Sequence, residues 1–121
     1  MPPAAAASAL KAIEIIEAEP DRRKQLWETT AYMKKALEGL GFDTGTSESP
    51  VIPLAIGDDL TTFTMARRLE EEGVFVNPVV NPAVPSGQAM IRTSYMATHK
   101  REHLDAALSA LAKVGRELDV I

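Results

Sequence analysis

The chain has 121 residues, a net charge of −4 from 13 basic and 17 acidic side chains, and no cysteine. This length fits one domain, residues 1–121, with a modest core. The acidic balance argues against nucleic acid as a partner, and the absence of cysteine excludes disulfides and thiolate metal sites and fits a reducing cytoplasm. We expect neither a signal peptide nor insertion in a membrane, because no basic region precedes the first apolar stretch and no apolar run is long enough to span a bilayer.

Two helices are predicted in the first 41 residues. The first begins at Pro2 and Pro3, since proline suits the first helical turn, and it ends or restarts at Pro20. The second stops at Gly39 and Gly41. Apolar residues recur at helical spacing in both. They are Leu10, Ile13 and Ile16 in the first helix, and Leu26, Met33, Leu37 and Leu40 in the second.

Two further helices are predicted later in the chain. One begins at Asp58 or Asp59, whose carboxylates can cap a helix, and is closed by Gly73. The last begins at Thr98 or His99, where a cap is the expected role of the histidine. The residues expected to face inward are Leu60, Phe63, Ala66 and Leu69 in the former, and Leu104, Leu108, Leu111 and Leu118 in the latter.

Three short apolar runs predict strands at residues 51–56, 74–77 and 89–95. The resulting order is ααβαββα, an α/β (α+β) fold. We expect a sheet of about three strands, antiparallel between the first and the third, with the helices on one face.

Arg92 is the only formally charged side chain between residues 73 and 98. Strand alternation places it on the face opposite Ile91 and Thr93, so it points away from the core if the helices cover those two residues. A guanidinium is a fork of donors that suits a carboxylate. Two alternatives remain open. Arg92 pairs with a carboxylate of this chain or is solvated, or the chain is a free-standing small α/β module that binds an anionic metabolite through Arg92.

A proline-rich loop, residues 77–87, precedes the strand of Arg92. Its three prolines remove backbone donors, so it cannot be a central strand. One interpretation is a flap over a ligand, the other a crossover that packs its valines on the core. The flap residues are Val79, Val80, Pro82, Ala83 and Val84, and the crossover would bury the three valines among them.

His99 and His103 are four residues apart, a spacing that can place two metal ligands on one helical face. Lys100 and Arg101 lie beside them and repel a cation, and no third ligand is apparent. We therefore expect no metal site.

Four segments, in this order, resemble the carboxy-terminal domain of the α-oxoamine synthases. They are PPAAAA at residues 2–7, SPVIPLAIGD at 49–58, GVFVNPVVNPAVPSG at 73–87, and AMIRTS with ATH at 89–99. These synthases are pyridoxal-phosphate (PLP) enzymes of the aspartate-aminotransferase fold, fold type I. The resemblance implies a homodimeric acyltransferase that condenses an amino acid, glycine or serine, with an acyl-CoA to give a 2-amino ketone, CoA and CO2. The expected activity is similar to that of 2-amino-3-ketobutyrate CoA ligase.

The resemblance also assigns roles to residues of this chain. In the family, the arginine matching Arg92 binds the carboxylate of the amino acid, and the loop matching residues 77–87 closes over the substrate. Many members carry a second arginine where this chain has Met90.

The Schiff-base lysine and the other groups that anchor the cofactor lie upstream of the matched region in the family. We therefore expect the small domain of a larger enzyme, which requires its own large PLP-binding domain for activity. The lysines present here lie in polar helical contexts, where none is expected to act as the nucleophile. They are Lys11, Lys24, Lys34, Lys35, Lys100 and Lys113.

Overall fold

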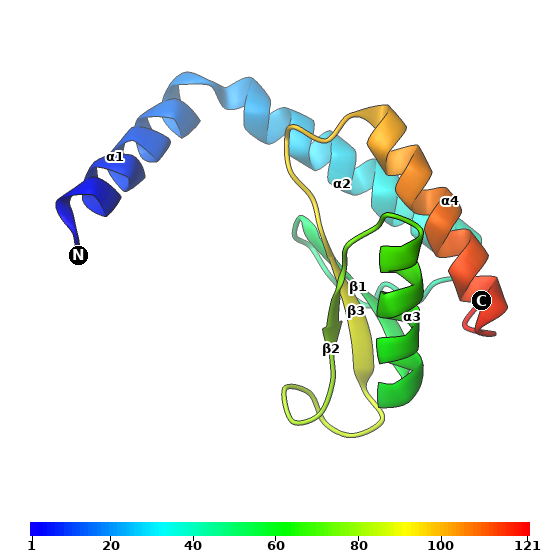
Figure 1. Cartoon of the computed structure of the whole chain (residues 1–121). Helices are drawn as coiled ribbons and strands as arrows, with labels where there is room; N and C mark the ends of the chain where they lie inside the picture. Colours follow the sequence, from blue (N-terminus) through cyan, green and yellow to red (C-terminus); the bar gives the residue numbers. More distant parts are fainter.

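The computed structural model describes all 121 residues and has the predicted element order ααβαββα (Figure 1). The helices are α1 (Pro3–Ala18), α2 (Pro20–Leu40), α3 (Asp59–Glu71) and α4 (Arg101–Glu117). The strands are β1 (Val51–Gly57), β2 (Asn77–Val79) and β3 (Ala89–Ser94).

The three strands form one antiparallel sheet of order β1-β3-β2, so the predicted pairing of the first and third strands is confirmed. Strand β3 is central and both neighbours are edge strands. Each edge strand contains a proline, Pro53 in β1 and Pro78 in β2. Proline is tolerated there because an edge strand has one side on which no ladder hydrogen bond is needed.

The second strand is displaced from its predicted position. Residues 74–77 were expected to pair, but β2 is Asn77–Val79 and includes the first proline of the loop. Residues 74–76 precede it without pairing, although their side chains alternate between core and surface as in a strand. Val76 is buried and Val74 packs against the core, whereas Phe75 is 81% exposed.

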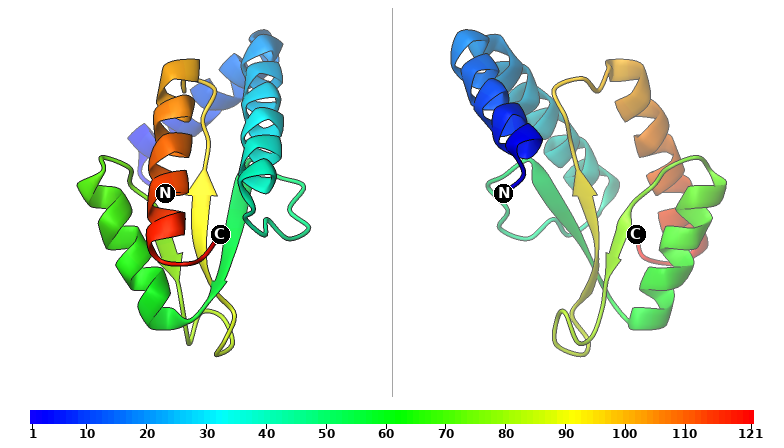
Figure 2. Two further views of the ribbon diagram at one scale, coloured as in Figure 1. Left: turned by 90° about the vertical axis from the view of Figure 1, so that its right-hand side faces the viewer. Right: turned by 60° about the vertical axis from the view of Figure 1, so that its left-hand side comes forward.

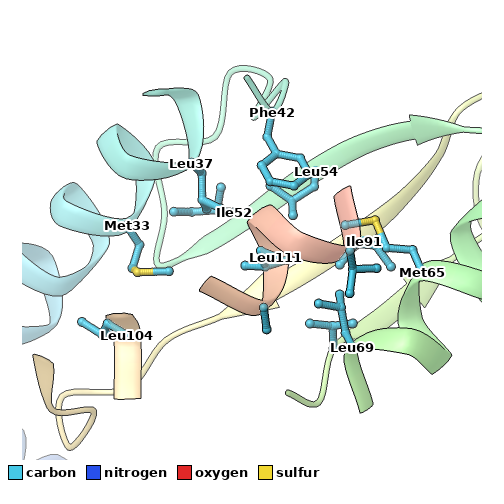
Figure 3. Close-up of a cluster of buried hydrophobic side chains, with 13 residues drawn as sticks. Met33, Leu37, Phe42, Ile52, Leu54, Met65, Leu69, Ile91, Leu104 and Leu111 are labelled. Carbon is cyan, nitrogen blue, oxygen red and sulfur yellow. The ribbon is translucent and has the colours of Figure 1, made fainter. Parts of the chain in front are cut away.

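Helices α2, α3 and α4 cover one face of the sheet (Figure 2). Their buried side chains meet those of β1 and β3 in a single core (Figure 3). Its largest fully buried members are Met33, Leu37, Ile52, Leu54, Met65, Leu69, Ile91 and Leu111.

The predicted inner face of α3 is only partly correct. Leu69 is buried, but Leu60 and Phe63 are 74% and 52% exposed, and Thr62 and Met65 are buried instead. The Thr62 hydroxyl donates to the carbonyl oxygen of Asp58 at 2.7 Å, so its polar group is satisfied and its methyl group can pack.

The ends of α3 and α4 follow different local bonds. The Asp58 side chain accepts a hydrogen bond from the Thr61 N–H at 2.7 Å, which confirms a predicted cap. The prediction that α4 begins at Thr98 or His99 is wrong, since it begins at Arg101. The His99 ring instead accepts from the Met96 N–H at 3.1 Å, which closes a turn before the helix.

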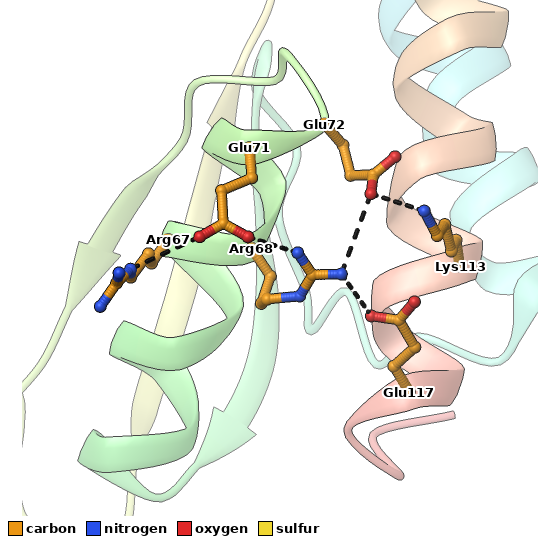
Figure 4. Close-up of polar contacts among 6 residues, drawn as sticks. All are labelled: Arg67, Arg68, Glu71, Glu72, Lys113 and Glu117. Atoms are coloured by element: carbon orange, nitrogen blue, oxygen red, sulfur yellow. Dashed lines mark hydrogen bonds and ion pairs between the residues drawn. The ribbon is translucent and has the colours of Figure 1, made fainter.

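A polar network joins α3 to α4 on the surface (Figure 4). Arg68 contacts Glu71 within α3 and Glu117 of α4, the latter at 3.0 Å. Lys113 of α4 lies 2.6 Å from Glu72. These groups are partly solvated, so we expect them to orient the two helices more than to stabilise them.

Helix α1 differs from the others because none of its residues is buried. It contacts α2 alone among the elements and extends away from the sheet and the other helices (Figure 1). Leu10, Ile13 and Ile16, whose spacing predicts this helix, are all about half exposed or more. The helix therefore presents an apolar stripe that no other part of this chain covers.

Candidate functional site

The sheet has one face that no helix of this chain covers. The register places Arg92, on the central strand, opposite Pro53 of β1 and Asn77 of β2. Alternation then assigns to the same face a set of residues that we call the open face. It consists of Val51, Pro53, Ala55, Asn77, Val79, Met90, Arg92 and Ser94.

Burial separates the two faces of the sheet. Every residue of the open face is exposed or half-buried. Ile91 and Thr93, the strand neighbours of Arg92, are buried under the helices. Arg92 itself is exposed, as alternation predicts. The guanidinium thus lies near the middle of the sheet and on the side away from the core.

The electrostatics of the open face depend on one side chain. Arg92 is the only charged residue there, and it takes part in none of the ion pairs of the chain. No side-chain hydrogen bond involves Arg92, Asn77 or Ser94 either. Arg92 is therefore not paired with a carboxylate of this chain. The face offers hydrogen-bond donors at an otherwise largely apolar surface, which suits an anion supplied from elsewhere.

The loop between β2 and β3 projects beyond the ends of these strands (Figure 1). Of the residues predicted to form a flap, Val79 lies in β2, opposite Met90. Val80 and Val84 are half-buried, and Pro82 and Ala83 are exposed. None of the three valines packs against the core cluster. The crossover interpretation is therefore wrong, and the loop is free of the core at one end of the open face.

The structure also contains a pocket that was not predicted from the sequence. It is a pocket of about 310 Å³ between α4, the end of β3 and residues 73–76, lined by His99, His103 and Tyr95 among mainly apolar side chains. Burial raises the pKa of Tyr95, whose hydroxyl donates to Thr93 at 2.9 Å. The imidazole rings of His99 and His103 each accept a hydrogen bond from a backbone N–H through Nδ1. The shared location of these three residues could not be read from their spacing.

The lysines of the chain do not fit the anchoring of PLP. A Schiff-base lysine needs an enclosed site that lowers the pKa of its amine. Here five of the six lysines are exposed and Lys34 is half-buried. Lys34 donates to the Ser47 carbonyl, while Lys11 and Lys113 pair with glutamates. None of the six lysines therefore lies in an enclosed site of this kind.

The structure contains neither a metal site nor a membrane-spanning helix. No three or more His, Asp or Glu side chains gather in a group that could hold a metal ion. No helix is both long and apolar enough to cross a membrane.

The model of the family described as aminotransferase class I and II matches residues 1–111. The chain belongs to this family. It is 52% identical over 120 residues to the 8-amino-7-oxononanoate synthase of Symbiobacterium thermophilum. It is 44% identical over 120 residues to the serine palmitoyltransferase of Sphingobacterium spiritivorum. These matches take in 99% of this chain but only 31% and 30% of the relatives, so the chain spans about a third of their length. The resemblance to α-oxoamine synthases is confirmed.

Solved structures agree with this assignment. A structure of SPT with PLP superposes on the whole chain with a TM-score of 0.93 at 27% identity, and the match takes in 31% of that chain. A serine palmitoyltransferase from S. paucimobilis, with a bound PLP–myriocin aldimine, matches 95% of this chain with a TM-score of 0.89 at 26% identity, over 29% of its own length. The fold predicted from the sequence is confirmed, and the group of enzymes to which the relatives belong depends on PLP.

Proposed function

We propose that this chain is the small domain of a longer α-oxoamine synthase and that Arg92 binds the carboxylate of the amino-acid substrate. The observation that carries the proposal is the unpaired guanidinium on a sheet face without any carboxylate. A fork of donors left free in this way is suited to two parallel hydrogen bonds with a carboxylate. The fit of the whole chain to serine palmitoyltransferase structures supports the same function.

In this proposal the open face is turned toward a large domain that holds PLP, and the substrate lies between the two. Arg92 fixes the orientation of the amino acid relative to the cofactor. The loop residues from Val79 to Val84 close over the substrate and exclude water. The second substrate is an acyl-CoA, the products are a 2-amino ketone, CoA and CO2, and the intact enzyme is a cytoplasmic homodimer. We favour an activity of the 2-amino-3-ketobutyrate CoA ligase kind, with glycine or serine as the amino acid.

A chimaera tests the proposal. The segment of the Symbiobacterium thermophilum relative that matches this chain is replaced by residues 1–121, and steady-state kinetics are measured with glycine, serine and alanine and with short and long acyl-CoAs. We expect Arg92→Ala to weaken apparent amino-acid affinity roughly ten- to hundredfold, because a hydrogen bond to a charged group contributes about 1.5–3 kcal/mol. The Michaelis constant for the acyl-CoA should change little.

Arg101→Ala is the matched control. This residue lies on α4 over the ring of Tyr32, at 3.5 Å from the ring centroid, and away from the open face. Its replacement should leave both Michaelis constants near the starting values. The site assignment fails if Arg92→Ala leaves the amino-acid Michaelis constant and the turnover unchanged. A folded chimaera that condenses none of these substrates would contradict the proposed function itself.

The free-standing module gives a different result with the isolated chain. A module that senses an anionic metabolite should bind such an anion tightly without any other domain. A small domain that needs its partner should bind carboxylates only weakly, because half of the site is missing.

A further inference from the structure

The two flanks of Arg92 on the open face are chemically different. On the β1 side its partner is Pro53, which has no side-chain donor, and on the β2 side its partner is Asn77. Directly opposed residues of an antiparallel pair have Cβ atoms about 4.5–5.5 Å apart and share a face. Among the polar residues of the open face, the register therefore places the Cβ atom of Asn77 nearest to that of Arg92, since Ser94 lies two residues along the same strand, roughly 6.5 Å away.

The Asn77 carboxamide is half-buried and makes no hydrogen bond within the chain. An amide group can donate two hydrogen bonds and accept two. A purely structural role at this strand position does not require a polar side chain beside an unpaired cation. The Asn77 amide instead provides a second hydrogen-bond donor beside the Arg92 guanidinium.

We propose that Asn77 is a second carboxylate-binding residue and that Asn77 and Arg92 together hold the amino-acid substrate. This inference rests on the function proposed above for Arg92. Each carboxylate oxygen has two lone pairs, and a bidentate arginine uses one on each. The Asn77 amide N–H donates to a remaining lone pair on the β2 side. Its carbonyl oxygen can accept from a guanidinium N–H and so keep the fork in the plane of the carboxylate.

The consequence is specificity for a planar carboxylate in one rotational orientation. Two donors from Arg92 fix the plane of the carboxylate, and a third donor from one side removes the equivalence of its two oxygens. Because the opposite flank is the Pro53 ring, the rest of the substrate is bounded by apolar surface there. The pair therefore selects small 2-amino acids over their amides, in which one oxygen is replaced by a donor that clashes with the donors of the site.

The first experiment uses the chimaera described above with Asn77→Ala and Asn77→Asp. We expect Asn77→Ala to raise the amino-acid Michaelis constant roughly tenfold and leave that of the acyl-CoA unchanged. Asn77→Asp should be worse than Asn77→Ala, because its carboxylate occupies the Arg92 fork and repels the substrate. Gln25→Ala is the matched control, since Gln25 carries the same carboxamide group, is exposed, and lies on α2 outside the open face and the loop. A role in strand structure alone would lower thermal stability and affect both substrates alike.

The second experiment uses the isolated chain and acetate as the probe, with acetamide as the neutral control. NMR of the labelled chain follows the Arg92 side-chain N–H and the Asn77 side-chain NH2 signals at constant ionic strength. We expect acetate to shift both signals with one weak dissociation constant, acetamide to shift neither, and Asn77→Asp to abolish the response of Arg92.

The outcomes separate the two proposals. If Arg92 responds and Arg92→Ala impairs the chimaera while both Asn77 variants leave the amino-acid Michaelis constant within twofold, the inference about Asn77 is overturned and the role of Arg92 stands. If acetate shifts neither signal and Arg92→Ala has no effect on the chimaera, the proposed function of the open face is overturned, and the inference with it.

Discussion

At the scale of single residues, the proposed function depends most on Arg92. It is a lone cation on a surface of mainly apolar side chains, where a guanidinium without a partner gains nothing from the protein. Its planar fork distinguishes it from a point charge. We expect Arg92→Lys in the chimaera to recover only part of the amino-acid affinity lost in Arg92→Ala. Full recovery in steady-state kinetics would show that charge alone is needed and that a bidentate contact is not made.

Asp58 gives a prediction about pH. Its carboxylate accepts from the backbone N–H and the hydroxyl of Thr61, and these bonds hold the pKa of Asp58 below its ordinary value. A carboxyl whose pKa is lowered by folding stabilises the fold above its unfolded pKa, about 3.9, and this contribution is lost as the pH falls through the folded pKa. Asp58→Asn keeps an acceptor but does not titrate.

Denaturant titrations of both proteins across acidic pH check this prediction. The unfolding free energy of the original chain should exceed that of Asp58→Asn by a constant amount near neutral pH. This difference should shrink as the pH falls below about 4. A difference that stays constant down to the lowest pH would mean that the charge of the cap does not contribute.

At the scale of helices, two glycines make a matched pair. Gly115 in α4 is buried, and a Cβ atom there would lie 2.9 Å from the ring of Phe42. Gly39 in α2 has open space around it. Overpacking costs about 1–3 kcal/mol, whereas replacing an unstrained helical glycine by alanine gains about 0.5–1 kcal/mol.

We therefore expect opposite signs from the two alanine substitutions in denaturant unfolding. Gly39→Ala should raise the unfolding free energy by about 0.5–1 kcal/mol. Gly115→Ala should lower it by about 1 kcal/mol, since Phe42 is buried and has little room to move. A gain in both variants would show that the end of α4 is loosely packed.

The helices also differ in how much they contribute to the core. Replacing Leu10, Ile13 and Ile16 of α1 together by alanine should change the unfolding free energy of the isolated chain very little, because none of them is buried. Met65→Ala in α3 should cost about 2–5 kcal/mol, because Met65 is fully buried. A large loss in the α1 variant would mean that α1 docks on this chain in solution.

At the scale of the whole molecule, two surfaces lack cover in this chain. They are the apolar stripe of α1 and the open face of the sheet. Exposed apolar surfaces of this kind mark interaction sites. We expect the isolated chain to bind the dye ANS, and addition of the matching remainder of the relative to suppress the fluorescence. The absence of binding would indicate that α1 or the loop folds over these surfaces.

The isolated chain should have no transferase activity and should form no specific adduct with PLP. Its lysines are exposed or engaged in surface contacts, so none lies in an enclosed pocket of the kind that a Schiff-base lysine needs. Mixing the chain with PLP, reducing with borohydride and mapping the product by mass spectrometry checks this. Stoichiometric labelling of one lysine would contradict the assignment of cofactor anchoring to residues outside this chain.

Much of the fold could be predicted because its signals are local. Several elements are determined by residues that are adjacent in the sequence. Examples are the prolines at the helix starts, the Asp58 cap and the apolar runs at β1 and β3. The errors have non-local causes. Leu60 and Phe63 match helical spacing as well as Thr62 and Met65 do, and only the position of the sheet decides which stripe is buried. The edge position of β2, which makes Pro78 acceptable, likewise depends on strand order.

The features of the candidate site likewise have either local or non-local causes. The sequence by itself determined that Arg92 is the only charge in its segment and that alternation separates it from Ile91 and Thr93, because the period of a strand is a local property. Only the tertiary structure decided that helices cover the second face and that Asn77 and Pro53 flank the arginine. Strand register joins residues that are 15 and 39 positions apart, and it is set by the packing of the whole sheet rather than by the residues themselves.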